Sequence, residues 1–148
     1  MADVTPRLRR AMTALLEHEP CGDGASARDM AAASGRALDR LSQRLTEIIG
    51  EAGVTALLLR AVARCRADFP FLNERVIRSG DERSHGEALC ARLQWHEPAV
   101  IKEVSIALLA TFASLLATIV GERLAWSLLR DVLPDTFTSE SERPEAEE

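Results

Sequence analysis

The side chains able to bind metals or carry out redox chemistry are few and poorly spaced for either. The chain has three histidines and three cysteines, and the candidates for a joint site are His18, Cys21, His85, Cys90 and His96. Their spacing matches neither a zinc finger nor the i, i+4 histidine pair of a helical metal site. Isolated residues of these types more often form helix ends, surface groups or small core side chains. The sequence therefore predicts no metal site and no cofactor.

Two glutamates could instead form a carboxylate pair for acid–base or two-metal chemistry. Glu51 and Glu122 stand at matching places in an internal repeat, where Ile48-Ile49-Gly50-Glu51 reappears as Ile119-Val120-Gly121-Glu122. Their ordinary role is to begin the following helix, because a carboxylate is stabilised at the positive end of the helix dipole. We expect that ordinary role and predict no catalytic residue.

The same repeat continues beyond the glutamates and indicates how the chain is built. Leu58-Leu59-Arg60-Ala61-Val62 matches Leu128-Leu129-Arg130-Asp131-Val132, and the two matched blocks are offset by 71 and 70 residues. Each copy has the pattern of a helix that ends at glycine, a turn and a second helix. Glycine suits such a turn because it enters left-handed backbone conformations freely. The sequence predicts two helical hairpins related by a pseudo-repeat.

Length and composition favour a single helical domain. The 148 residues are 47% hydrophobic and only 4% aromatic, and alanine and leucine, which favour helices, dominate. We expect an all-α bundle of five or six helices in residues 1–133, with helices over 5–19, 26–49, 51–67, 84–95, 98–121 and 122–133. Residues 134–148 hold six acidic side chains and one basic, which is the whole net charge of −5. This acidic tail is predicted to be disordered.

The helix expected over residues 98–121 is the most apolar segment and raises the question of a membrane. Residues 104–120 carry no charge, a length just sufficient to span a bilayer. Lys102 and Glu103 lie one turn into this helix, and the other helices are amphipathic, so we expect burial in a soluble bundle. One side of the helix gathers large residues and the other gathers small ones. The small face could be internal core or the interface of a homodimer, and the sequence leaves both open.

Residues 27–45 are similar to a helix-turn-helix DNA reader. Met30 and Gly35 fit the apolar and turn positions of that motif, whereas Ser34, Arg36 and Arg44 occupy places that it normally buries. The body of the chain also balances to zero charge, which gives no basic footprint for nucleic acid. The alternative is one long helix with Gly35 inside it, and we expect no nucleic-acid partner.

The chain resembles a group of bacterial all-helical proteins for which no activity is established. The residues that carry this resemblance are the two repeat blocks, Leu41, Leu45 and Phe69-Pro70-Phe71-Leu72. The resemblance covers about residues 26–134. It implies a small soluble protein associated with bacterial signalling genes, and it transfers no functional residue.

These observations lead to an expected function. We expect a cytoplasmic protein-interaction module, an adaptor or regulator in bacterial signalling that forms homodimers and does not enter a membrane. An alternative is a ligand-binding bundle or enzyme with a buried polar site, and a second alternative is DNA binding through residues 27–45. The expected interaction surface comprises Ala110, Ser114, Thr118, Trp126, Arg60 and Arg130.

Overall fold

The computed structural model describes residues 6–17, 26–72 and 84–133, and every regular element within these ranges is an α-helix. The all-α prediction is therefore confirmed. The candidate residues His18 and Cys21, for which the sequence predicts no metal site, and the acidic tail at 134–148 lie outside the described residues. The helices are α1 (Pro6–Glu17), α2 (Ala27–Cys65), α3 (His85–Leu93), α4 (Pro98–Val120) and α5 (Glu122–Arg130).

Helix ends follow local side-chain chemistry. The Ser26 hydroxyl accepts a hydrogen bond from the Asp29 backbone N–H (3.1 Å) at the start of α2, and Ser84 caps α3 through Glu87 N–H (3.0 Å). Pro98 stands at the first position of α4, where its missing N–H costs nothing. These capping signals place three helix starts where the sequence predicts them.

Two glycines redirect the chain. Gly50 (φ 80°, ψ 165°) bends α2 into a first arm, residues 27–49, and a second arm, residues 51–65. Gly121 (φ 93°, ψ 152°) makes the corresponding turn between α4 and α5. This region of backbone space is essentially restricted to glycine. The two predicted turn glycines thus share nearly the same conformation.

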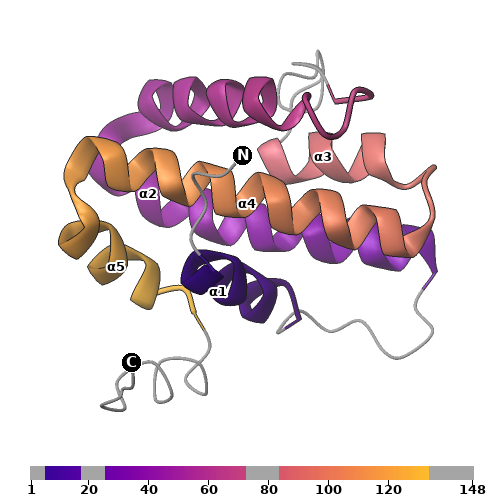
Figure 1. Cartoon of the computed structure of the whole chain (residues 1–148), viewed down its shortest axis with the longest axis horizontal. Helices are drawn as coiled ribbons and strands as arrows, with labels where there is room; N and C mark the ends of the chain where they lie inside the picture. The colour runs from indigo at the N-terminus through magenta and orange to yellow at the C-terminus, as the bar shows by residue number, and fades with distance from the viewer. Residues whose placement is uncertain (1–5, 18–25, 73–83, 134–148) are drawn as a thin grey trace.

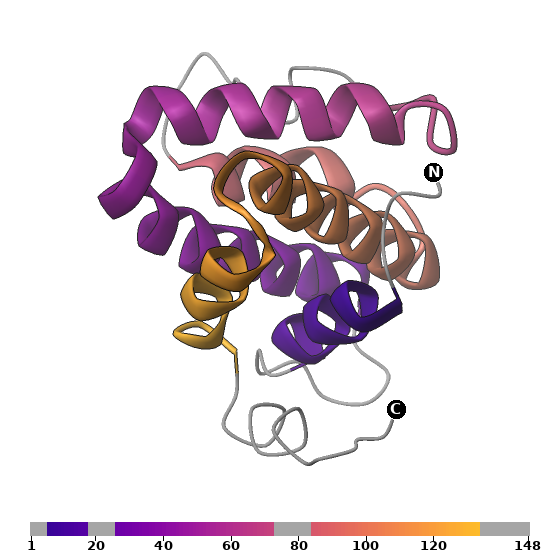
Figure 2. The same cartoon turned by 60° about the vertical axis from the view of Figure 1, so that its left-hand side comes forward.

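The two hairpins are arranged around a pair of parallel helices. The first arm of α2 and α4 run side by side in the same direction, so both turns lie at one end of the bundle (Figure 1). The second arm returns on one side of α4 and α5 returns on the other, while α3 lies between the two arms of α2 (Figure 2). Helix α1 packs against α4.

The core lies along α4 and the first arm. Phe112 and Leu108 of α4 and Leu38, Leu41 and Leu45 of the first arm are completely buried. Two buried serines join the helices, because Ser105 Oγ donates to Ser34 Oγ at 2.6 Å. Ser34 and Ser105 are 71 residues apart, the same offset as the repeated Gly-Glu blocks. This buried hydrogen bond therefore joins the first arm directly to α4.

Burial of α4 changes along the helix as well as around it. Leu109 from the large-residue side and Ala110 from the small-residue side are both fully buried, whereas Thr118 and Ile119 near the end are both exposed. By length and composition, α4 is the one described helix able to cross a membrane, with mean hydropathy 2.0, and 61% of its most apolar window is buried in the protein. That degree of burial is also typical of a core helix.

Residues 27–45 form one continuous helix within the first arm, and Gly35 is buried inside it. The turn that a helix-turn-helix motif requires at Gly35 is absent from this segment, so the second alternative lacks its structural basis. Ile48 corrects another expectation. The apolar spacing of Leu41, Leu45 and Ile48 predicts that Ile48 faces the core, but its side chain is 47% exposed, because it lies in the last turn of the arm, where neighbouring helices no longer cover it.

Candidate functional site

The predicted interaction residues do not form one surface. Ala110 is fully buried in the chain's own core, Ser114 is half-buried, and Thr118 is exposed. Arg60 lies exposed on the second arm and Arg130 lies exposed on α5, and these two helical segments return on opposite sides of α4 (Figure 2).

Trp126, the remaining residue of that predicted surface, is engaged within the chain. It is half-buried on α5, and the Arg7 guanidinium lies over its ring, 4.2 Å from the ring centroid. This cation–π contact links α1 to α5.

Glu51 and Glu122 stand at the starts of helical segments. Glu51 and Glu122 each follow a turn glycine and are exposed. Among the described residues there is no group of three His, Cys, Asp or Glu side chains that could hold a metal ion. The arrangement suits the dipole role at both helix starts.

Large apolar side chains are exposed at the end of the bundle where both hairpins turn. They are Ile48 (47% exposed) on the first arm, Ile119 (64%) on α4 and Leu124 (45%) on α5, and we call them the end face. Ile48 and Ile119 are matching residues of the repeat. An apolar group drawn from three helices at one end is typical of a contact surface.

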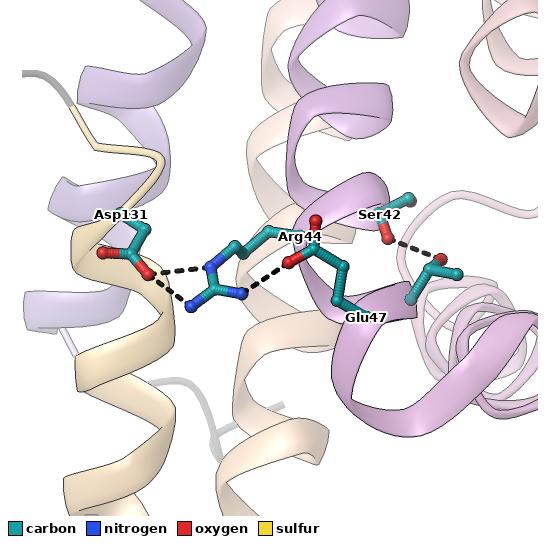
Figure 3. Close-up of polar contacts among 5 residues, drawn as sticks. Ser42, Arg44, Glu47 and Asp131 are labelled. Carbon is teal, nitrogen blue, oxygen red and sulfur yellow. Dashed lines mark hydrogen bonds and ion pairs between the residues drawn. The ribbon is translucent and has the colours of Figure 1, made fainter.

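An ion pair holds α5 beside the first arm near this face (Figure 3). Arg44 donates from Nε to Asp131 Oδ2 at 2.7 Å, and its second guanidinium nitrogen lies 2.6 Å from the same oxygen. A third nitrogen donates to Glu47 at 2.8 Å. The hydrogen bond to Asp131, with the charges of Asp131 and Glu47, raises the pKa of Arg44 against a smaller desolvation effect. The guanidinium is a fixed positive link between the two hairpins.

A second region combines polar side chains in a pocket. Between the arms of α2 and the start of α3 lies a pocket of about 320 Å³, which we call the arm pocket. The described residues that line it all have polar or ionisable side chains except Val54, and apolar atoms of these side chains also face the pocket; the residues are Asp39, Ser42, Gln43, Thr46, Glu51, Val54, Thr55, Ser84 and His85.

Asp39 builds one wall of the arm pocket by anchoring α3. Its Oδ1 accepts from Gly86 N–H at 2.9 Å, and its Oδ2 accepts from Ser84 Oγ at 2.8 Å. This approach requires glycine on both helices, because a Cβ on Gly35 would collide with the Gly86 carbonyl and one on Gly86 would collide with Gly35 and Asp39. The close contact between the backbones of Gly35 and Gly86 therefore holds the start of α3 against the first arm beside the pocket.

Thr55 and His85 also line the pocket. Thr55 Oγ1 lies 3.3 Å from His85 Nε2, within hydrogen-bonding distance. The pocket thus joins residues from both arms of α2 to the first turn of α3.

The described cysteines and His96 have structural roles. Burial raises the pKa of the Cys65 thiol, and desolvation raises that of Cys90 more than nearby Arg36 and Arg28 lower it. Both thiols are therefore disfavoured as thiolate nucleophiles. His96 stacks on Phe71 with 4.2 Å between ring centroids, at the end of the bundle away from Gly50.

The sequence does hold a signal for the arm pocket that the search for metal and catalytic motifs misses. Asp39, Ser42 and Thr46 recur at helical spacing and so share one side of the first arm. Such a polar stripe on a helix with a buried apolar face indicates a second, hydrophilic contact. Its partners, Thr55, Ser84 and His85, come from distant parts of the chain.

Comparison with family models, curated proteins and solved structures found no match for this chain. The resemblance on the repeated Gly-Glu blocks therefore stays a prediction, and the end face and the arm pocket are the two candidate sites among the described residues.

Proposed function

We propose that this protein is a small protein-interaction module that forms a two-fold homodimer through the end face. In this proposal it acts in the bacterial cytoplasm as an adaptor or regulator in signalling. Exposure of Ile48, Ile119 and Leu124 at one end carries the proposal. Burying such side chains against a second copy removes apolar surface from water, which is the main driving force of association.

The charges around the end face suit contact with an identical surface. A two-fold interface brings the same patch of both subunits together, so the patch must be complementary to itself. Glu47 and Glu122 are exposed acids near the face, and Arg123 and Arg130 are exposed bases on α5. Acids of one subunit can therefore lie opposite bases of the other.

The central pair of helices gives the module a rigid base. Its buried side chains are apolar apart from three serines, Ser34, Ser42 and Ser105. A filled core of this kind leaves little room for a deeply buried catalytic site, which favours an interaction role over an enzyme. Thr118 and Ile119 are exposed in the last turn of α4, so this turn is available for the proposed contact. A dimer that uses the last two helices requires such exposure.

Light scattering over micromolar concentrations tests the proposal. We expect a mass near twice the 16.2 kDa monomer, which falls to the monomer mass in Ile119→Glu. Trp95→Glu is the matched control, because Trp95 is 80% exposed at the other end of the bundle; this variant should stay dimeric. A monomeric wild-type protein, or equal dissociation of both variants, would contradict the proposal.

A further inference from the structure

We propose that the arm pocket binds a small organic cation that carries N–H donors, such as a primary amine in its ammonium form. This inference is independent of the end face, since the pocket lies between the arms of α2 and the start of α3. Its volume of about 320 Å³ is at the lower end of small-molecule sites.

The charge of the wall selects a cation. Asp39 and Glu51 line the pocket, and no lysine or arginine is among the described residues that line it. Glu51 has no hydrogen bond or ion pair to another described residue, so its carboxylate is available at the rim. A concave surface lined by one sign of charge concentrates ions of the opposite sign.

A buried hydroxyl gives the second, independent observation. Ser42 lies in the pocket wall and is only 6% exposed, yet its Oγ has no hydrogen-bond partner among the described residues. Buried polar atoms are nearly always paired in folded proteins. A ligand N–H that donates to Ser42 Oγ would satisfy this oxygen, and the neighbouring Thr46 and Thr55 hydroxyls add further acceptors.

The same wall favours an organic cation over a metal ion. Calcium needs six to eight oxygen ligands, and the described residues contain no group of three His, Cys, Asp or Glu side chains that could hold an ion. The Asp39 carboxylate already accepts two hydrogen bonds. The remaining acceptors of the pocket come from separate residues of both arms and α3, and a ligand with several N–H groups can donate to them individually.

Calorimetric titration with butane-1,4-diamine tests the charge and donor requirement. We expect a Kd of about 0.1–1 mM, since a ligand of few atoms gains limited binding energy. Butane-1,4-diol has the same chain without charge and should not bind, and magnesium chloride should not compete. Absence of diamine binding, or equal binding of the diol, would overturn the proposal.

Two variants locate the site. Glu51→Gln should weaken diamine binding about five- to tenfold, as loss of a charged hydrogen bond predicts, whereas Glu103→Gln removes an exposed acid outside the pocket and should leave the Kd unchanged. Ser42→Ala should also weaken binding without lowering the melting temperature. In wild-type protein, the amide NMR signal of Gly86 should shift on titration because its N–H bonds Asp39 in the wall. Equal weakening by both glutamine variants, or an unmoved Gly86 signal, would contradict this location.

Discussion

The two hairpins turn at glycines of nearly equal conformation but enclose different neighbours. The hairpin at Gly50 opens around α3, and its arms and α3 create the polar arm pocket. The hairpin at Gly121 brings a short amphipathic helix against the core, where Leu128 and Leu129 are buried and Asp131 pairs with Arg44. The turn is thus a local property, whereas the position of the returning helix depends on what packs beside it.

This difference assigns separate roles to the two hairpins. A helix held away by an inserted neighbour leaves space for a ligand, and a helix packed directly against the core leaves apolar side chains such as Leu124 at the surface. Similar turns thereby accompany a polar pocket in the first hairpin and part of the proposed contact face in the second.

The largest expected effect concerns the packing that separates the arms of the first hairpin. Gly86→Ala should cost about 3 kcal/mol or more of unfolding free energy, because the new Cβ meets backbone atoms of Gly35 that cannot move aside. Urea denaturation measures this loss. Gly53→Ala is the control, since its Cβ meets only the Ile49 side chain at 3.2 Å, and it should be close to neutral. A neutral Gly86→Ala would refute the close contact.

Substitution of the turn glycines tests whether the two turns are equivalent. Gly50→Ala and Gly121→Ala should each cost about 1–3 kcal/mol, because alanine is strained at their φ and ψ angles. Neither new Cβ would have an atom within 4 Å, so the two losses should agree closely when measured by urea denaturation. A markedly larger loss at one glycine would show that tertiary packing, and not the turn alone, sets its conformation.

The contact between the hairpins should contribute less. Ser105→Ala removes the bond to Ser34 and should cost about 1 kcal/mol, while Ser34 keeps its own bond to the Met30 carbonyl (3.0 Å). Ser42→Ala removes an unpaired hydroxyl and should leave stability unchanged or slightly higher. Parallel thermal and urea unfolding of both variants gives the comparison. Equal destabilisation by the two substitutions would contradict the distinction between paired and unpaired serines.

The smallest expected effect is local to the second hairpin. Asp131→Asn removes the charge that Arg44 binds and should speed amide hydrogen exchange in α5 with little change in global stability, since exposed ion pairs contribute weakly. Glu47→Gln is the matched control, because Glu47 lies on the same arm as Arg44 and does not hold α5. Equal acceleration in both variants would show that Asp131 does not anchor the helix.

Helix limits and the buried stripe were predictable because both depend on neighbours in sequence. Ser26, Ser84 and Pro98 act within one turn of their own helices, and glycine conformation at Gly50 and Gly121 is equally local. The all-α fold class followed from these signals and from the spacing of leucines such as Leu38, Leu41 and Leu45.

The arm pocket and the limits of burial were not predictable in the same way. Glycine within a helix normally weakens it, but the missing side chain of Gly86 allows α3 to approach Gly35 of α2, a contact between residues 51 positions apart in sequence. Ile48 fits the apolar period of the first arm, yet periodicity does not report how far a neighbouring helix extends. Such features require the positions of distant segments.

The pairing of two parallel helices has a consequence for synthesis of the chain. Leu38, Leu41 and Leu45 share a core with α4, and residues 98–120 leave the ribosome only after the whole of α2 and α3. The first arm therefore emerges with an apolar side that its final partner cannot yet cover. Since exposed apolar surface on incomplete chains promotes aggregation, we expect the nascent hairpin at Gly50 to be prone to aggregation until α4 has been synthesised.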